Sequence, residues 1–348
     1  MKKILFVMAA LIGCITVTKA QTSFIATLQH ESEFSHYYGA GALTEAYKAA
    51  AEGDIITLSP GTFTWSGTFN KGVTLRGAGV ESENKTYISS TITFASTDNA
   101  RTVTVEGIRF SGDTYVENNS SGTGQGTIKF IKNTFKYLYA SRASSYSTER
   151  GPAVRIYNCA IKGMCFDSNT YPDFLFYNCY VVNPYCYTPF SETTTAFVNC
   201  VINYTNYYAY IAYYLNFYNS IFNWTYGSYS GNSTDYILPN TATCYNCLSI
   251  NKSTLFNNLV SGGNNKTVGS AADVFTTYRS AQNEGETFEL TSVAKEAYIG
   301  TDGTQIGMQG GNYPYTTTVQ YPIITKFSSD SQTNKKGILN IEVEVDGK

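Results

Sequence analysis

Apolar and polar residues alternate in short segments of the chain, and the phase of this alternation changes at regular intervals. In the segment LFYNCYV, the apolar positions before the central Asn178 are the second and fourth residues back, Phe176 and Phe174. After Asn178 they are the first and third residues on, Cys179 and Val181. A strand with one buried face alternates with a period of two and cannot change phase while it stays straight. The backbone is therefore predicted to turn a corner at the central residue.

This corner segment recurs along the chain at intervals of 20 to 30 residues, a period typical of a solenoid of stacked coils. Its central positions are Gly77, Gly107, Asn133, Asn158, Asn178, Asn199, Asn219 and Asn246. Gly and Asn tolerate a left-handed backbone best, which a corner of this kind requires. We expect the stacked carboxamides to hydrogen-bond from coil to coil. The copy at Asn133 is irregular, because Ile128, Phe130 and Phe135 fit a shifted register.

The two ends of the repeat have patterns of their own. Near the N-terminus, four apolar residues recur at helical spacing: Leu43, Ala46, Tyr47 and Ala50. They predict a short amphipathic helix that covers the open end of the core. Residues 54–58 are expected to form the first strand. Toward the C-terminus, residues 323–327 and 341–345 predict a terminal hairpin.

The first twenty residues have the pattern of a secretory leader. Two lysines precede an apolar run over residues 4–17, which is too short to cross a bilayer, and Thr18-Lys19-Ala20 resembles a signal-peptidase site. Alternatively, Leu11-Ile12-Gly13-Cys14 is a lipobox in which Cys14 carries the lipid. The predicted organisation is a signal peptide over 1–20, a solenoid over 21–320 and a β-strand tail over 321–348, with no transmembrane segment.

Charge and cysteine content narrow the choice of partners and cofactors. Removing the leader removes three lysines and no acids, so the formal net charge changes from −2 to −5. No basic run is present, and nucleic acid is not an expected partner. The cysteines fall into the repeat: Cys159, Cys179 and Cys200 are expected to form one inward row, and both cysteines of the CxxC at Cys244 are expected to face inward as buried thiols.

Three segments carry a family resemblance: GDIITLSPGTFTW, GVTLRGAG and the serial YNC words resemble the pectin-lyase-like right-handed parallel β-helix superfamily. The chain is similar in particular to secreted β-helix proteins of Gram-negative gut bacteria, which share the IGTDGTQIGMQGGNYPY segment and a short β-rich tail. The resemblance covers roughly residues 38–348. It implies an all-β, right-handed parallel β-helix of about eight or more coils, with an N-terminal capping helix and a C-terminal β tail. Together with the leader, it predicts a protein that is secreted, periplasmic or on the surface of a Gram-negative bacterium, and we expect a monomer.

The resemblance does not fix an activity, because this fold hosts lyases, hydrolases, esterases and non-enzymatic surface proteins. The clustered aspartates and the His-Gly element of polygalacturonase-like members are missing. A lyase of this superfamily would use Lys or Arg as its base, for which the candidates are Arg150, Arg155 and Lys162. It would hold Ca²⁺ through acids such as Asp167 and Asp173, and no other cofactor is expected. Alternatively, these charges are solvated surface groups.

Tyrosine is the most informative residue type, with 30 copies in 348 residues. The expected carbohydrate-contacting rings lie beside the corners and face outward: Tyr157, Tyr177, Tyr180, Tyr218 and Tyr245. Further outward candidates are Tyr204, Tyr207, Tyr208, Tyr213 and Tyr214. A row of rings on a flat β-face can stack on sugar rings, although tyrosine also suits any half-exposed strand.

Three functions are consistent with these observations. The first is a non-catalytic, polysaccharide-binding or surface-associated protein. The second is a pectate-lyase-like enzyme that acts by β-elimination on an acidic glycan. The third is a structural or adhesive surface solenoid without a sugar ligand.

Overall fold

The computed structural model describes residues 24–81, 84–95, 101–118, 126–142, 152–166, 173–186, 195–205, 213–224, 238–277, 286–319, 323–329 and 341–346. The predicted signal peptide and the alternative lipid site at Cys14 lie outside these residues. Within them, no helix is both long and apolar enough to cross a membrane.

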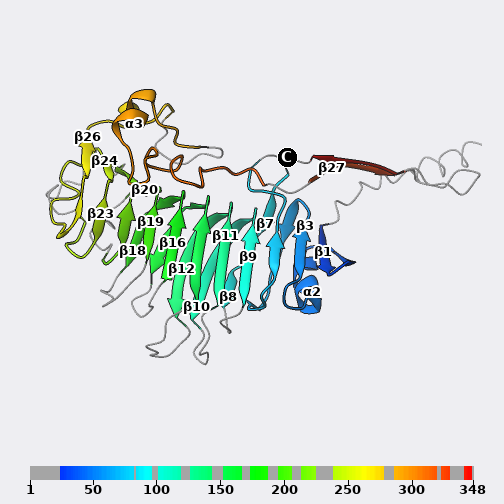
Figure 1. Ribbon diagram of the computed structural model, residues 1–348. Coiled ribbons are helices and arrows are strands. Elements are labelled where there is room, and N and C mark those ends of the chain that lie inside the picture. Colours follow the sequence, from blue (N-terminus) through cyan, green and yellow to red (C-terminus); the bar gives the residue numbers. More distant parts are fainter. Residues whose placement is uncertain are drawn as a thin grey trace, which may run out of the picture.

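All described strands except the last two stack into two long sheets, which form the walls of a solenoid (Figure 1). Sheet A contains, in spatial order, β2 (Glu33–Tyr38), β1 (Ile25–His30), β3 (Ile55–Leu58), β6 (Thr74–Arg76), β9 (Thr102–Glu106), β11 (Thr127–Ile131), β13 (Ala153–Tyr157), β16 (Asp173–Tyr177), β19 (Ala196–Val198), β21 (Asn216–Tyr218), β23 (Thr243–Tyr245) and β25 (Ser261–Gly263). From β3 onward the neighbours are parallel, whereas β1 pairs antiparallel with β2 and β3.

Sheet B continues each coil after its corner. Its main path is β26 (Lys266–Val268), β24 (Leu248–Ile250), β22 (Ile221–Trp224), β20 (Val201–Tyr204), β17 (Tyr180–Val182), β14 (Ala160–Ile161), β12 (Thr134–Arg142), β10 (Arg109–Asn118), β7 (Thr86–Ile88) and β4 (Gly61–Phe63). Four more strands pair beside this path: β5 (Thr68–Phe69), β8 (Ile92–Ala95), β15 (Met164–Phe166) and β18 (Pro184–Cys186). This arrangement confirms the all-β parallel β-helix.

The corners lie where the phase change predicts them. Five corner asparagines have φ between +50° and +53°: Asn158, Asn178, Asn199, Asn219 and Asn246. Sheet register aligns them in one row with Gly107, whose φ is +67°. We call this the corner row. It also contains Asn264, at φ +57°, which the repeat analysis did not identify.

Two details of the corner predictions were wrong. In the irregular copy the corner is Lys132, at φ +54°, and Asn133 is the residue after it. Gly77 aligns with Gly107 but does not have a left-handed backbone. Glycine is needed there for space instead, because a Cβ would come within 2.5 Å of the Gly107 carbonyl oxygen.

The lumen of the solenoid is filled as the alternation predicts. Phe176, Phe197 and Phe217 from successive coils of sheet A are fully buried and stack with ring centroids 4.3 and 5.0 Å apart. Cys159, Cys179 and Cys200 form the inward row after the corner and are all free thiols. The two cysteines of the CxxC are buried as well. Burial in these apolar surroundings raises the pKa of the Cys159 and Cys200 thiols.

The outer face of sheet B near the corners is also buried, because the segment that includes the described residues 271–277 and 286–319 covers it. This segment contains the 3₁₀ helix η2 (Ala271–Asp273) and the helix α3 (Ser292–Ala297). Val201, Ile221 and Leu248 point away from the lumen and pack with Phe288 and Met308 in a second apolar cluster. Strands that are buried on both faces have nearly continuous apolar sequences. Residues 200–202 (CVI) and 220–222 (SIF), which follow the corners, are examples.

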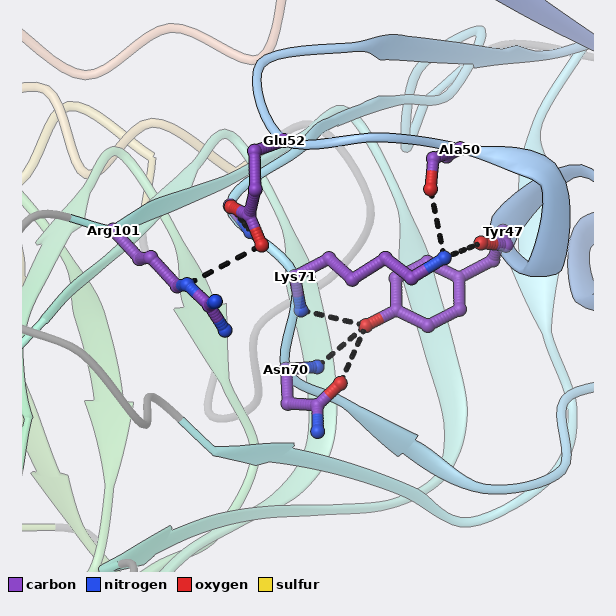
Figure 2. A network of polar contacts seen from close by, with 7 residues as sticks. Tyr47, Ala50, Glu52, Asn70, Lys71 and Arg101 are labelled. Atoms are coloured by element: carbon purple, nitrogen blue, oxygen red, sulfur yellow. Dashed lines mark hydrogen bonds and ion pairs between the residues drawn. The ribbon is translucent and has the colours of Figure 1, made fainter. Parts of the chain in front are cut away.

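The N-terminal end of the solenoid is closed by the predicted helix, α2 (Ala42–Ala49), whose buried residues include Leu43, Ala46 and Tyr47. Figure 2 shows how Tyr47 holds the next coil. Its hydroxyl accepts hydrogen bonds from the Asn70 and Lys71 backbone N–H groups at 2.6 and 2.7 Å. The Lys71 ammonium donates to the carbonyls of Tyr47 and Ala50 at the C-terminal end of α2. These bonds satisfy carbonyl groups that the helix end leaves without intrahelical partners.

The predicted terminal hairpin is present as β27 (Ile323–Ser329) and β28 (Ile341–Asp346), which pair antiparallel. In Figure 1, β27 lies beyond the β3 end of the solenoid.

Candidate functional site

The corner row is a binding surface for the chain's own C-terminal segment. Residues 299–319, which we call the strap, run from α3 back along the upper edge of the solenoid in Figure 1. Asn219 accepts a hydrogen bond from the Thr301 N–H at 3.0 Å, and Asn178 Nδ2 donates to the carbonyls of Met308 and Gly310 at 2.8 and 2.6 Å. The carboxamides of Asn178 and Asn219 therefore bind the strap, and the predicted coil-to-coil bonding between them was wrong.

The same pattern continues to the start of the row. With its amide oriented to satisfy both groups, Asn158 donates to the carbonyls of Tyr313 and Pro314 at 3.2 Å. Lys132 Nζ donates to the Thr318 carbonyl at 2.5 Å. Burial lowers the pKa of Lys132, and the Glu106 carboxylate opposes that shift.

Two close approaches to the corner row explain why the strap is rich in glycine. A Cβ on Gly311 would lie 2.2 Å from Asn199 Nδ2, and one on Gly300 would lie 2.8 Å from the Asn219 side chain. Glycine therefore lets the strap backbone approach the corner row closely. Beside Asn199, burial acts to raise the pKa of Asp302, but hydrogen bonds from Thr304 and Asn199 lower it below its ordinary value.

Coil-to-coil hydrogen bonding occurs one residue after the corner. Asn133 Oδ1 accepts the Ile108 N–H at 2.9 Å, and Cys159 Sγ accepts the Asn133 N–H at 3.3 Å. Ser220 Oγ accepts the Cys200 N–H at 3.1 Å in the same way. The inward thiols thus act as hydrogen-bond acceptors as well as small apolar groups, and buried N–H groups are satisfied.

The predicted outward tyrosines of sheet A lie in one row beside the corners. Tyr157 and Tyr177 stack at 5.2 Å and 8°, and Tyr218 and Tyr245 stack at 6.0 Å and 4°. Val198 separates the two pairs in the row. The strap ring Tyr313 contacts Tyr157 and Tyr177 edge-on, so this half of the row is partly covered.

Two predicted outward tyrosines are buried. Tyr180 is 2% exposed, because Phe288 stacks on its ring at 5.0 Å and Asn203 Nδ2 donates to its hydroxyl. Tyr204 is inside the lumen and fully buried. The assignment of Tyr180 as a sugar-contacting residue was therefore wrong. Tyr213 and Tyr214 are half-buried, whereas Tyr207 and Tyr208 lie outside the described residues.

A second group of outward tyrosines was missed by the sequence analysis. Tyr115, Tyr139 and Tyr185 occupy one register position on β10, β12 and β18, with Cys165 of β15 between the last two. Tyr115 and Tyr139 stack at 4.9 Å and 14°, and Tyr137 lies 6.0 Å from Tyr139. We call Tyr115, Tyr137, Tyr139 and Tyr185 the tyrosine shelf.

The shelf combines flat rings with charged neighbours. Tyr137 is 43% exposed, and the next coil has Gly163 beside it, where a Cβ would lie 2.4 Å from the ring. Lys136 Nζ lies 5.6 Å from the Tyr137 ring centroid and 3.9 Å from Asp113. Burial, with a smaller contribution from Asp113, raises the pKa of Tyr139 to about 12. Its hydroxyl therefore stays protonated at neutral pH and can donate a hydrogen bond.

The candidate lyase residues do not converge in the described structure. Arg155 forms a two-point ion pair with Asp173 of the next coil, at 2.9 and 3.2 Å. Lys162 is exposed in the turn between β14 and β15 of sheet B, whereas Arg155 is in sheet A. Arg150 and Asp167 lie outside the described residues. Among the residues that are described, no group of three His, Cys, Asp or Glu side chains is arranged to hold a metal ion.

The chain matches no known family model, no curated protein and no solved structure.

Proposed function

We propose that this chain is a secreted, non-catalytic polysaccharide-binding protein of the pectin-lyase-like superfamily from a Gram-negative bacterium. The observation that carries the proposal is the tyrosine shelf, where stacked and partly exposed rings lie on a flat sheet face in successive coils. The corner tyrosines Tyr157, Tyr177, Tyr218 and Tyr245 supply a second row parallel to the solenoid axis.

The physical basis is contact between sugar rings and aromatic faces. A pyranose ring has an apolar face that removes water from an aromatic ring on contact, while its hydroxyls bond to polar groups nearby. Tyrosine hydroxyls, Asp113 and Lys136 supply such groups around the shelf. Because the rings repeat from coil to coil, a polymer can contact several of them at once, which raises its overall affinity above that of a single sugar.

A retention experiment with a panel of neutral and acidic polysaccharides tests the proposal. The shelf variant Tyr137→Ala plus Tyr139→Ala removes two rings, at about 0.5–1.5 kcal/mol each, and is expected to weaken binding roughly 5- to 150-fold. The corner variant Tyr177→Ala plus Tyr218→Ala is expected to lose less, since Tyr313 already contacts Tyr177. The matched control is Tyr38→Ala, a ring 66% exposed on the terminal strand β2.

Product analysis in the same experiment separates the competing functions. Intact polysaccharide recovered from the wild-type protein, with weaker retention by the shelf variant, supports a binding protein. Release of unsaturated, ultraviolet-absorbing products would identify a lyase instead. Failure of the wild-type protein to retain any polysaccharide would overturn the proposal in favour of an adhesive or structural solenoid.

A further inference from the structure

The corner row continues beyond the part that the strap occupies. The strap first reaches the row at Asn219, through Thr301, and two corner asparagines lie beyond that point, Asn246 and Asn264. Their backbones have the same left-handed conformation, at φ +51° and +57°. Neither carboxamide hydrogen-bonds to any described residue, in contrast to Asn158, Asn178 and Asn219.

Both carboxamides line an open cavity of about 410 Å³ between the last coils and the segment that follows α3. Tyr298 and Ile299 also line the cavity. Lys266 reaches across from β26, donating to the Ala297 carbonyl at 2.9 Å with its ammonium 5.3 Å from the Tyr298 ring centroid. This volume falls within the range of small-molecule sites, and the wall combines an aromatic ring with several hydrogen-bonding groups.

The occupied positions show what a corner carboxamide recognises. Asn178 donates to two backbone carbonyls of the strap, and Asn219 accepts a backbone N–H. Asn219 also bonds to the Thr301 hydroxyl, at 3.3 and 3.4 Å. The backbone partners are groups of secondary amides, each of which offers one N–H donor and one carbonyl acceptor. A ligand that presents a secondary amide to Asn246 and Asn264 would repeat these bonds.

We propose that this cavity binds an N-acetylated amino sugar. The inference rests on the proposed function, because it names a sugar class for a protein proposed to bind glycans, although at a site separate from the tyrosine shelf. The acetamido group bonds to Asn246 and Asn264, the ring hydroxyls bond to Lys266, and the apolar face of the ring lies against Tyr298. Residues 297–299 form a wall of the cavity, which favours a compact ligand over an extended peptide.

Calorimetric titration of the full protein with two disaccharides tests the inference. N,N′-diacetylchitobiose and cellobiose share ring shape and linkage but differ in the acetamido group. We expect binding of the first and at least tenfold weaker binding of the second. Saturation-transfer NMR is expected to show the acetyl methyl groups as the protons closest to the protein.

Two variants place the binding in this cavity. Asn246→Gly plus Asn264→Gly removes both carboxamides while keeping residues that accept the left-handed backbone, and it is expected to weaken binding at least tenfold. Asn251→Gly is the matched control, since Asn251 is exposed, has φ +62° and does not line the cavity. A double variant that binds diacetylchitobiose as the wild-type protein does would overturn the inference.

The remaining outcomes also decide between explanations. Equal binding of cellobiose and diacetylchitobiose would exclude recognition of the acetamido group. If an N-acetylated, amidated tripeptide binds more tightly and displaces the sugar, the ligand of the cavity is a polypeptide instead. The shelf variant Tyr137→Ala plus Tyr139→Ala is expected to bind diacetylchitobiose normally. If the wild-type protein retains no polysaccharide but still binds this disaccharide through Asn246 and Asn264, the cavity assignment stands and the proposed function falls.

Discussion

Replacement of Asn178 by glycine is expected to release the middle of the strap. Asn178 is 1% exposed, and its Nδ2 group donates to the carbonyls of Met308 and Gly310. Each hydrogen bond contributes about 0.5–1.5 kcal/mol net, so the two together amount to about 1–3 kcal/mol. Glycine accepts the backbone at φ +53°, so the substitution removes the two bonds without adding left-handed backbone strain. Alanine at the same position would add about 1–2 kcal/mol of left-handed backbone strain.

Hydrogen exchange with mass spectrometry measures this effect locally. The amide of Gly307 donates to the Asn219 carbonyl and therefore reports on strap docking, whereas the amide of Tyr315 donates to the Met308 carbonyl and reports on the fold of the strap itself. A loss of about 2 kcal/mol corresponds to roughly 30-fold faster exchange of strap amides. Asn251→Gly makes the same substitution at an exposed left-handed corner and is expected to leave the strap unchanged. Equal exchange in the two variants would refute the view that corner carboxamides hold the strap.

Three further predictions concern other parts of the chain. Tyr47→Phe removes the acceptor of two backbone N–H groups and is expected to destabilise the N-terminal cap by about 1–3 kcal/mol in urea unfolding; an unchanged midpoint would contradict this role. Asp54 raises the pKa of His30 above 6.5. The His30–Asp54 interaction therefore stabilises the folded protein below pH 6.5, and this contribution is lost as the pH rises through the raised pKa of His30. Thermal unfolding should show that Asp54→Asn abolishes this pH dependence, and persistence in the variant would exclude the pair as its source. Cys165 is the half-exposed thiol among the described cysteines, so Cys165→Ser is expected to remove the fast phase of native-state thiol labelling; a fast phase that survives would show that the inward thiols are accessible.

The corners could be predicted because a left-handed backbone is a local requirement that Asn and Gly meet. The short-range periodicity of apolar residues also predicted the inward-facing thiols, the capping helix and the terminal hairpin. The corner at Lys132 could not be predicted, because lysine is not typical of a left-handed corner. Its side chain instead donates a hydrogen bond to the carbonyl of Thr318, 186 residues further along the chain.

The sites were harder to predict because they depend on distant segments. Alternation shows which side of a strand a residue faces but not what covers that side. Tyr180 faces out of the lumen and is buried by the C-terminal segment, from which Phe288 stacks on its ring. The available signal was the continuous apolar run after each corner, which is typical of strands buried on both faces. The shelf depends on a register shift between Phe110 and Asp113, which the sequence does not reveal.

The strap also limits how this protein can evolve. Solenoids commonly gain or lose whole repeats, because each coil contacts only its neighbours. Here a single covalent segment is fastened at Asn219, Asn178, Asn158 and Lys132 in turn, at spacings set by its own bends and glycines. Insertion or deletion of one coil in this interval would displace every later anchor by about 4.8 Å, the strand spacing. Thr317 of the strap also donates to Glu81 at 2.6 Å, so the number of repeats between Glu81 and Asn219 is inherited as a fixed unit.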